Sequence, residues 1–296
     1  MKCSLLIIAA LTLTAVAGCT PADNARRSTD GTPLPSITVS IPPQASLLRA
    51  IAGDSINIVT LLGSEANPET FEPGIKTMTA VAASDMIMLS GALGFEQVLV
   101  GKLTDNNRDI KVVDTSAGIE LIYGTHYHNG HEHRDAPDPH TWTSARNARI
   151  IASNMLKALV ELDPAHTNYY TSRAALLDSR LDSIDCATAS RLEHGSEKAF
   201  IVWHPSLSYY ARDYGLRQIV IASADSRETS IASTRASIDS IRANGNTHTL
   251  FLQAGFDADR AHALSDQTGA SIVTINPLDY DWEKQFNIIT DALTRH

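Results

Sequence analysis

The stretch DPAHTNYYTSRAALLDSRLDSI, residues 163–184, decides the fold of this chain. Its Asp-Pro start is a strong break after one helix and suits the first turn of the next. Apolar side chains then recur at helical spacing, with Ser, Arg and Asp between them, at Tyr170, Ala174, Leu177, Leu181 and Ile184. The pattern predicts a helix of about 25 residues, roughly 37 Å long at the standard rise. A helix of that length can connect two lobes.

Short β-forming stretches alternate with helical ones on both sides of this helix. Such alternation predicts parallel strands with helices on the faces of the sheet. We expect strands at 36–41, 56–62, 86–90 and 110–113 before the helix, and at 200–203, 218–222, 249–252 and 271–275 after it. The predicted fold class is α/β, with two lobes that each hold a mainly parallel sheet flanked by helices, joined by one long bridging helix. A ligand is expected between the lobes, beyond the carboxyl ends of the strands.

The amino-terminal segment has the form of an export signal. Met1-Lys2 gives a charged start, residues 4–17 form an apolar run too short to span a bilayer, and Val16-Ala17-Gly18-Cys19 resembles a bacterial lipoprotein cleavage site. Cys19 would then carry a lipid, whereas the alternative is an ordinary signal peptide with an incidental cysteine. The expected organisation is a lipoprotein signal peptide at 1–19, a tether at 20–35, an N-terminal α/β lobe at 36–164 with a His-rich loop at 126–134, the bridging helix at 165–193 and a C-terminal α/β lobe at 194–296.

Composition limits the classes of protein and of ligand. With 296 residues, 43% hydrophobic and 19% charged, the chain has the length of two globular domains and is neither disordered nor a polytopic membrane protein. A formal net charge of -9 disfavours nucleic acid and anionic ligands and suits a cation. Cleavage before Cys19 leaves Cys186 as the other thiol, so an intramolecular disulfide and a cysteine-rich zinc site are excluded.

Histidines gather in one short stretch. Five of the eleven fall within fifteen residues, at His126, His128, His131, His133 and His140. Neutral imidazole is the commonest side-chain ligand of borderline transition metals, so this density points to a divalent metal, although the first four could also belong to a solvated loop without a ligand. Pro139 restricts the residue before it to extended backbone, which presents His140 from a rigid segment.

Metal-binding side chains stand beside a proline in four loops, each just after a strand or before a helix. They are Glu69 and Glu72 in residues 66–73, His140 after Pro139, His204 before Pro205, and Asn276 and Asp279 around Pro277. Taken singly, each could be a turn residue or a helix cap. Two imidazoles with one or two carboxylates make a suitable site for zinc, and an acceptable one for manganese or iron.

Several motifs together resemble a known family. These are Ile51-Ala52-Gly53-Asp54, Asp138-Pro139-His140-Thr141-Trp142, Asp163-Pro164 with Tyr169-Tyr170, and His204 ahead of Tyr214-Gly215-Leu216. In this order they resemble the zinc-type substrate-binding lipoproteins of zinc and manganese ABC transporters. The resemblance covers nearly the whole mature chain. It implies that His140 and His204 bind a metal between the lobes, and that the partners are an ABC permease and its ATPase.

The same resemblance implies an exported, monomeric protein that is anchored to a bacterial membrane through lipid on Cys19. It also implies that the protein is not an enzyme. The chain departs from the family pattern at two positions: Glu69 stands where the family usually has histidine, and Asn276 where it has aspartate. We therefore predict Glu69, His140, His204 and Asp279 as metal ligands, with Asn276 as the alternative to Asp279. If Glu69 binds through both oxygens, no fourth side chain is needed.

The histidine-rich loop resembles an accessory metal-collecting or sensing segment of the zinc members and favours Zn²⁺, with Mn²⁺ or Fe²⁺ as the alternative.

A surface zinc hydrolase would need a general base, for which Glu72 or Asp138 could serve, but the chain has neither an HExxH helix nor a Gly-x-Ser-x-Gly elbow. A surface adhesin or a metal chaperone would use the same site, and sequence does not separate these tasks from uptake.

Overall fold

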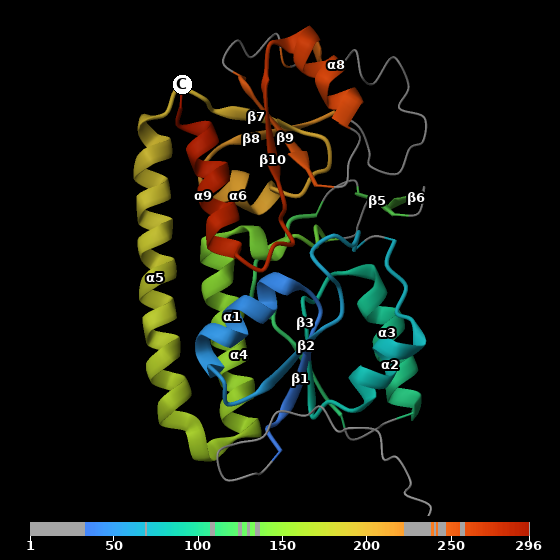
Figure 1. Ribbon diagram of the computed structural model, residues 1–296. Coiled ribbons are helices and arrows are strands. Elements are labelled where there is room, and N and C mark those ends of the chain that lie inside the picture. The colour runs from blue at the N-terminus through green and yellow to red at the C-terminus, as the bar shows by residue number, and fades with distance from the viewer. Residues whose placement is uncertain are drawn as a thin grey trace, which may run out of the picture.

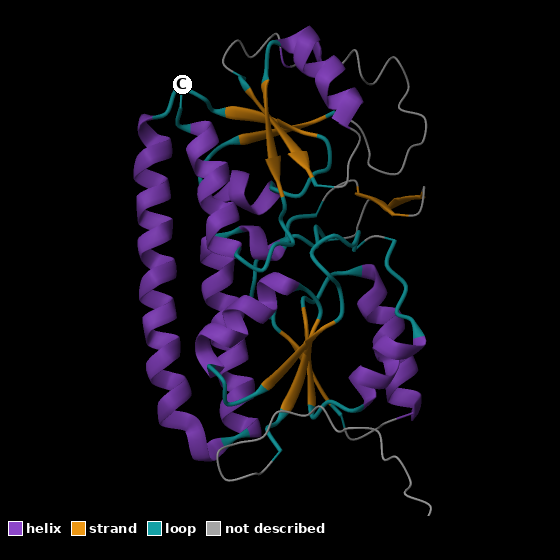
Figure 2. Ribbon diagram, in the orientation of Figure 1, coloured by secondary structure: helices purple, strands orange, loops and turns teal. Residues whose placement is uncertain are grey.

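The computed structural model describes residues 33–68, 70–106, 110–123, 126–128, 131–133, 137–221, 238–239, 241, 247–254 and 258–295. Two α/β lobes lie one above the other, and a long helix runs beside both of them (Figure 1). Loops that leave the two sheets meet at the junction between the lobes (Figure 2). The expected fold class is confirmed.

The N-terminal lobe is built on a parallel sheet with the strand order β2-β1-β3-β4. Its strands are β1 (Ser36–Val39), β2 (Asn57–Thr60), β3 (Met86–Leu89) and β4 (Lys111–Asp114), and its helices are α1 (Pro42–Ala52), α2 (Ile75–Ala82) and α3 (Gly94–Asn106). The central strand β3 is buried along its whole length. Its continuous apolar run, Met-Ile-Met-Leu, is typical of a parallel strand covered on both faces.

The C-terminal lobe repeats this plan with the strand order β10-β9-β7-β8, again parallel. Its strands are β7 (Ala199–Val202), β8 (Arg217–Val220), β9 (Thr249–Gln253) and β10 (Ser271–Ile275), and its helices include α6 (Ser208–Asp213), α8 (Ala258–Thr268) and α9 (Trp282–Leu293). Residues 238, 239 and 241 are also helical. Each lobe therefore directs the carboxyl ends of four parallel strands to one edge of its sheet.

Two helices connect the lobes. Helix α4 (Ala145–Leu162) begins at Ser144, whose hydroxyl accepts a hydrogen bond from the Asn147 amide, and α5 (Thr167–His194) follows after a 3-10 turn (Pro164–His166). Helix α5 contacts α1 and α4 and also α9 of the other lobe. The predicted long bridging helix is thus present, with 28 residues.

Helix α5 approaches α1 closely at Gly53, which ends α1 with a positive φ of 56°. A Cβ at this glycine would lie 2.2 Å from the hydroxyl oxygen of Tyr169. The Arg173 guanidinium then donates to the carbonyl oxygens of Ala50 and Ile51 at 2.9 and 3.1 Å. Only glycine allows both the backbone conformation and this approach.

A single apolar core continues from one lobe into the other. It joins buried side chains of the N-terminal sheet and of α4 to Leu207, Tyr209, Tyr210, Phe286 and Leu293 of the C-terminal lobe. A second, smaller cluster lies between the C-terminal sheet and α8 and includes Ile201, Leu250 and Leu264. The lobes are therefore packed against each other and are not connected by the bridging helix alone.

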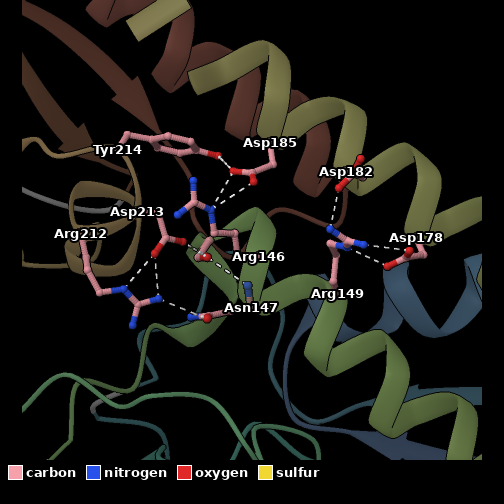
Figure 3. Close-up of polar contacts among 10 residues, drawn as sticks. Arg146, Asn147, Arg149, Asp178, Asp182, Asp185, Arg212, Asp213 and Tyr214 are labelled. Atoms are coloured by element: carbon pink, nitrogen blue, oxygen red, sulfur yellow. Dashed lines mark hydrogen bonds and ion pairs between the residues drawn. The ribbon is translucent and has the colours of Figure 1, made fainter. Parts of the chain in front are cut away.

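The exposed faces of α4 and α5 are held by ion pairs. Arg149 contacts Asp178 at 2.7 Å and Asp182 at 2.6 Å, and Arg146 contacts Asp185 at 3.1 Å (Figure 3). The Tyr214 hydroxyl donates to Asp185 at 2.8 Å, which brings the end of α6 to the same helix pair.

Other expectations fall in part outside the described residues. The signal peptide at 1–19 with Cys19 and most of the tether at 20–35 lie there, and the proposed division of the chain into domains stays a prediction. Within the expected His-rich loop, β5 (His126–His128) and β6 (His131–His133) form an antiparallel ribbon. Among the residues that the structure describes, no helix has both the length and the apolar character to cross a bilayer.

Core packing should matter more for stability than the ion pairs on the same helix. Met155 of α4 is fully buried, so we expect Met155→Ala to lower the free energy of unfolding by about 2–5 kcal/mol. Arg149 and its partners are one-third to one-half exposed, so Arg149→Ala should cost about 1 kcal/mol or less. Urea unfolding of the two metal-free variants measures both. Equal losses would show that the surface network is a main source of stability.

Candidate metal centre

Two histidines from different lobes face each other at the lobe junction. His140 precedes a 3-10 turn (Thr141–Thr143) that leads into α4, and His204 follows β7. Their Nε2 atoms lie 3.1 Å apart, their ring centroids lie 4.9 Å apart, and the ring planes are inclined by 73°. Both residues are buried, with exposed fractions of 3% and 7%.

Asp138 orients the first of these imidazoles. Its Oδ1 lies 2.8 Å from Nδ1 of His140 and also accepts the His140 backbone N–H at 2.9 Å. A carboxylate can only accept, so in the neutral imidazole of His140 the ring proton is on Nδ1 and the Nε2 lone pair points toward His204. Burial alone would raise the pKa of the Asp138 carboxyl, but the attraction and the hydrogen bonds of His140 hold that pKa below its ordinary value.

The spacing of the two imidazoles is close to that of neighbouring ligands of one ion. Two nitrogens at about 2.0–2.1 Å from a tetrahedral zinc ion lie roughly 3.3–3.4 Å apart. The observed 3.1 Å separation is also a hydrogen-bond length, so the same arrangement lets one ring donate to the other when no ion is bound. Small movements of either ring convert one arrangement into the other.

Two tryptophans fasten the His140 segment to the C-terminal lobe. The Trp142 indole N–H donates to the Pro277 carbonyl at 2.8 Å, and the Trp282 indole N–H donates to the Trp142 carbonyl at 2.6 Å. The Trp142 ring lies 5.3 Å from the His140 ring, centroid to centroid. The turn after β10 is therefore fixed directly against the segment that carries His140.

Polar contacts also hold the segment around His140 against α6, the helix that follows His204. Ser144, which begins α4, hydrogen-bonds Asp213 at the end of α6. Arg212 pairs with Asp213 and donates to Asn147 Oδ1 at 3.3 Å (Figure 3). The Tyr209 hydroxyl donates to the Asp138 carbonyl at 2.8 Å. Helix α6, which follows His204, is thereby bound to the segment that precedes and follows His140.

The described part of the structure does not show the carboxylates that the sequence suggested as ligands together with the two histidines. Glu69 lies outside the described residues, and Glu72 is exposed. Asp279 is partly buried; one of its oxygens accepts the Asp281 N–H at 2.9 Å and the other accepts the Gln285 side-chain amide at 3.1 Å. The residues that the structure describes contain no group of three or more His, Cys, Asp or Glu side chains arranged to hold an ion. The roles of Glu69 and Asp279 as ligands stay predictions.

Asn276, the alternative to Asp279, contacts the opposite lobe. Its side-chain amide donates to the Ser64 carbonyl at 3.1 Å and its Oδ1 accepts the Leu278 N–H at 3.0 Å. The β5–β6 ribbon contains His126, His128, His131 and His133. The structure describes the backbone of these four residues.

Sequence reasoning did not find the orienting role of Asp138, which it considered only as a general base of a hydrolase. The signal was present, because an aspartate two residues before a candidate histidine can reach its Nδ1 in a turn. The indole contacts of Trp142 and Trp282 had no sequence signal, since the two residues are 140 positions apart.

Comparisons with known proteins agree with this architecture. Residues 37–292 match the family described as ZnuA, the periplasmic component A of a zinc-uptake complex. Among solved structures, one entitled "Crystal structure of ZnuA" is 30% identical with a TM-score of 0.80, covering 88% of this chain and 98% of that one. A zinc-bound ZnuA with residues 138–173 of its own numbering deleted is 29% identical with a TM-score of 0.79, covering 89% and 99%.

Curated relatives give the same result. The high-affinity zinc uptake protein ZnuA of Bacillus subtilis is 24% identical over 251 residues, which cover 82% of this chain and 78% of that protein. The zinc-binding lipoprotein AdcA of Streptococcus pneumoniae strain R6 is 25% identical over 253 residues, 82% of this chain but only 50% of AdcA. This chain therefore matches about half the length of AdcA.

The Asp138 carboxylate should affect metal affinity although it does not face His204. We expect Asp138→Asn to weaken zinc binding by about 10–100-fold, because the loss of charge makes the imidazole of His140 less basic and less firmly oriented. Competition with a chelator measures the Kd. The control is Asp163→Asn, which alters another carboxylate–imidazole pair, with Nδ1 of the exposed His166 at 2.7 Å. Equal effects of the two changes would contradict the assigned role.

Proposed function

The chain belongs to the ZnuA family of periplasmic zinc-uptake components, and we propose that it captures Zn²⁺ at the lobe junction and delivers it to an ABC permease. The observation that carries this proposal is the buried His140–His204 pair, with Nε2 atoms 3.1 Å apart. Both rings come from loops at carboxyl ends of parallel strands, the usual place of ligands in open α/β sheets.

The proposed ligand set is His140, His204 and Glu69, with a fourth position filled by Asp279 or by the second oxygen of Glu69. The sequence supports Glu69, because it lies between Pro68 and Pro73 in the loop that follows β2. Two imidazoles suit zinc better than the harder manganese ion, which is why we propose zinc as the cargo and Mn²⁺ or Fe²⁺ as the alternative.

The sequence supports an accessory role for the four histidines of the β5–β6 ribbon. We propose that His126, His128, His131 and His133 collect or sense the ion before it reaches the buried pair. Four histidines within eight residues are a composition typical of metal-binding segments.

Release of the ion should need only local movements. The apolar core continues between the lobes and α5 packs against elements of both, so wide hinge opening would expose a large apolar surface. We propose that loops, including the one that carries Glu69, move to admit and release the ion while the lobes stay together. The proposed partners are the permease and its ATPase, and the proposed form is a monomer anchored outside the cytoplasm through lipid on Cys19.

Zinc binding should depend on both buried histidines. We expect one tight site in a calorimetric titration of the metal-free protein, and at least about a hundredfold loss of affinity in His140→Ala and in His204→Ala, more than the loss of an orienting group causes. His166→Ala is the control, because that imidazole is more than half exposed on the surface.

One further variant separates the options for the fourth ligand. Asp279→Ala should weaken binding strongly if Asp279 coordinates the ion, and little if Glu69 binds through both oxygens.

Unchanged zinc affinity in both histidine variants would refute the proposed site. Tighter binding of Mn²⁺ or Fe²⁺ than of Zn²⁺ in the unchanged protein would reassign the cargo.

The lipid anchor has its own test. Cys19→Ser removes the thiol that would carry the lipid, so the protein should move from the membrane fraction to the soluble exported fraction of cells. Cys186→Ser is the control, because Cys186 is an exposed thiol within α5. An unchanged membrane fraction in Cys19→Ser would show that the segment is an ordinary signal peptide or that another feature binds the membrane.

A further inference from the structure

The side chain of Asn276 connects the last strand of the C-terminal lobe to a loop of the N-terminal lobe. Its Nδ2 donates to the carbonyl oxygen of Ser64 at 3.1 Å, across 212 positions of sequence. Ser64 lies in the loop after β2, a few residues before Glu69. Residues 63–67 form the Ser64 loop. The amide of Asn276 thus contacts the backbone of the loop to which we assign one of the metal ligands.

The two ends of this side chain have different partners. Oδ1 accepts the Leu278 N–H at 3.0 Å, while Nδ2 faces the Ser64 carbonyl oxygen, which can only accept. An aspartate has the same shape and could still accept from Leu278. It could not donate to Ser64, and its second oxygen would face another acceptor.

The turn that carries Asn276 is itself rigidly held. The Asn276 N–H donates to Gln285 of α9 at 2.9 Å, and the Pro277 carbonyl accepts from the Trp142 indole at 2.8 Å. Pro277 and Leu278 are buried. The amide is therefore presented to Ser64 from a fixed point, so the Ser64 loop is the part that this hydrogen bond restrains.

We infer that Asn276 is a positioning residue that fastens the Ser64 loop across the lobe junction, and that it is not a metal ligand. The hydrogen bond itself is independent of any ion. Its consequence for zinc rests on the proposed function, because it holds the start of the loop that bears Glu69 and should slow the escape of the ion.

The decisive change is Asn276→Asp, which keeps the shape and the acceptor and removes the donor. In metal-free protein we expect hydrogen exchange of the amides of residues 63–67 to rise about three- to tenfold, the range of one neutral hydrogen bond. In zinc-loaded protein we expect dissociation of zinc to a chelator to accelerate by a similar factor. Asn276→Ala should act in the same direction in both measurements.

The control is Asn57→Asp at the start of β2, whose side-chain amide donates to the Ser36 hydroxyl at 3.3 Å. It adds the same charge, in the lobe that contains Ser64, and should leave exchange at 63–67 unchanged. The visible spectrum of Co²⁺-substituted protein should be the same for Asn276→Ala as for the unchanged chain, because no ligand is lost.

Two results would overturn the inference: an altered Co²⁺ spectrum in Asn276→Ala, or unchanged exchange at 63–67 in both variants. The first would identify position 276 as part of the coordination shell. Faster exchange in a protein that binds no zinc would retain the positioning role of Asn276 and refute only the proposed function.

Discussion

The approach of His140 to His204 is the contact on which the site depends, and it requires two polar rings to be buried between lobes. Burial of imidazoles and of the Asp138 carboxylate removes their hydration, which costs free energy unless each group finds a partner. Asp138 satisfies one nitrogen of His140, and the two Nε2 atoms face each other. A cation between these nitrogens would replace the lost hydration, so an arrangement that is costly for a simple core is well prepared for a metal.

Such preparation needs lobes that keep their relative position. The apolar core that crosses the junction and the reciprocal indole contacts of Trp142 and Trp282 supply this rigidity. The ion pairs between α4 and α5 lie on the outer face and add orientation more than stability, because solvent screens exposed charges. In the proposed mechanism α5 limits the motion of the lobes, whereas in a hinged protein a flexible linker would permit it. The proposed movement is that of the loops at the junction.

The sequence predicted the parts of this structure that depend on periodicity. Helix α5 and the eight strands of the two sheets follow from spacing that local residues determine, and the boundaries differ by a few positions where turns compete. Strand β2, for example, spans Asn57–Thr60 within the expected range 56–62. The β5–β6 ribbon was not predicted, since its His, Tyr and Glu residues form no apolar alternation.

The candidate site was predictable only in part, for the same reason. His140 and His204 stand beside prolines at strand or helix boundaries, so residue type and position were enough to select them. The contact of Asn276 with Ser64 and that of Trp142 with Pro277 join segments 212 and 135 positions apart. Such contacts depend on how the lobes dock, which no local pattern encodes. The orientation of His140 by Asp138 lies between these cases. The two residues are neighbours in sequence, but the contact matters for a metal site only because the Nε2 atom of His140 points toward His204.

The amide at position 276 bears on which ion the site would prefer. A carboxylate there could add a hard oxygen ligand, and oxygen-rich sites suit manganese, whereas imidazole-rich sites suit zinc. An amide that donates to Ser64 cannot at the same time present a charged oxygen to an ion. Because it is neutral, the Asn276 amide contributes no anionic oxygen to the junction. In the proposed site this leaves His140 and His204 as the dominant ligands and shifts the preference toward zinc, so that the packing of the lobes and the selection of the ion have a common origin in one side chain.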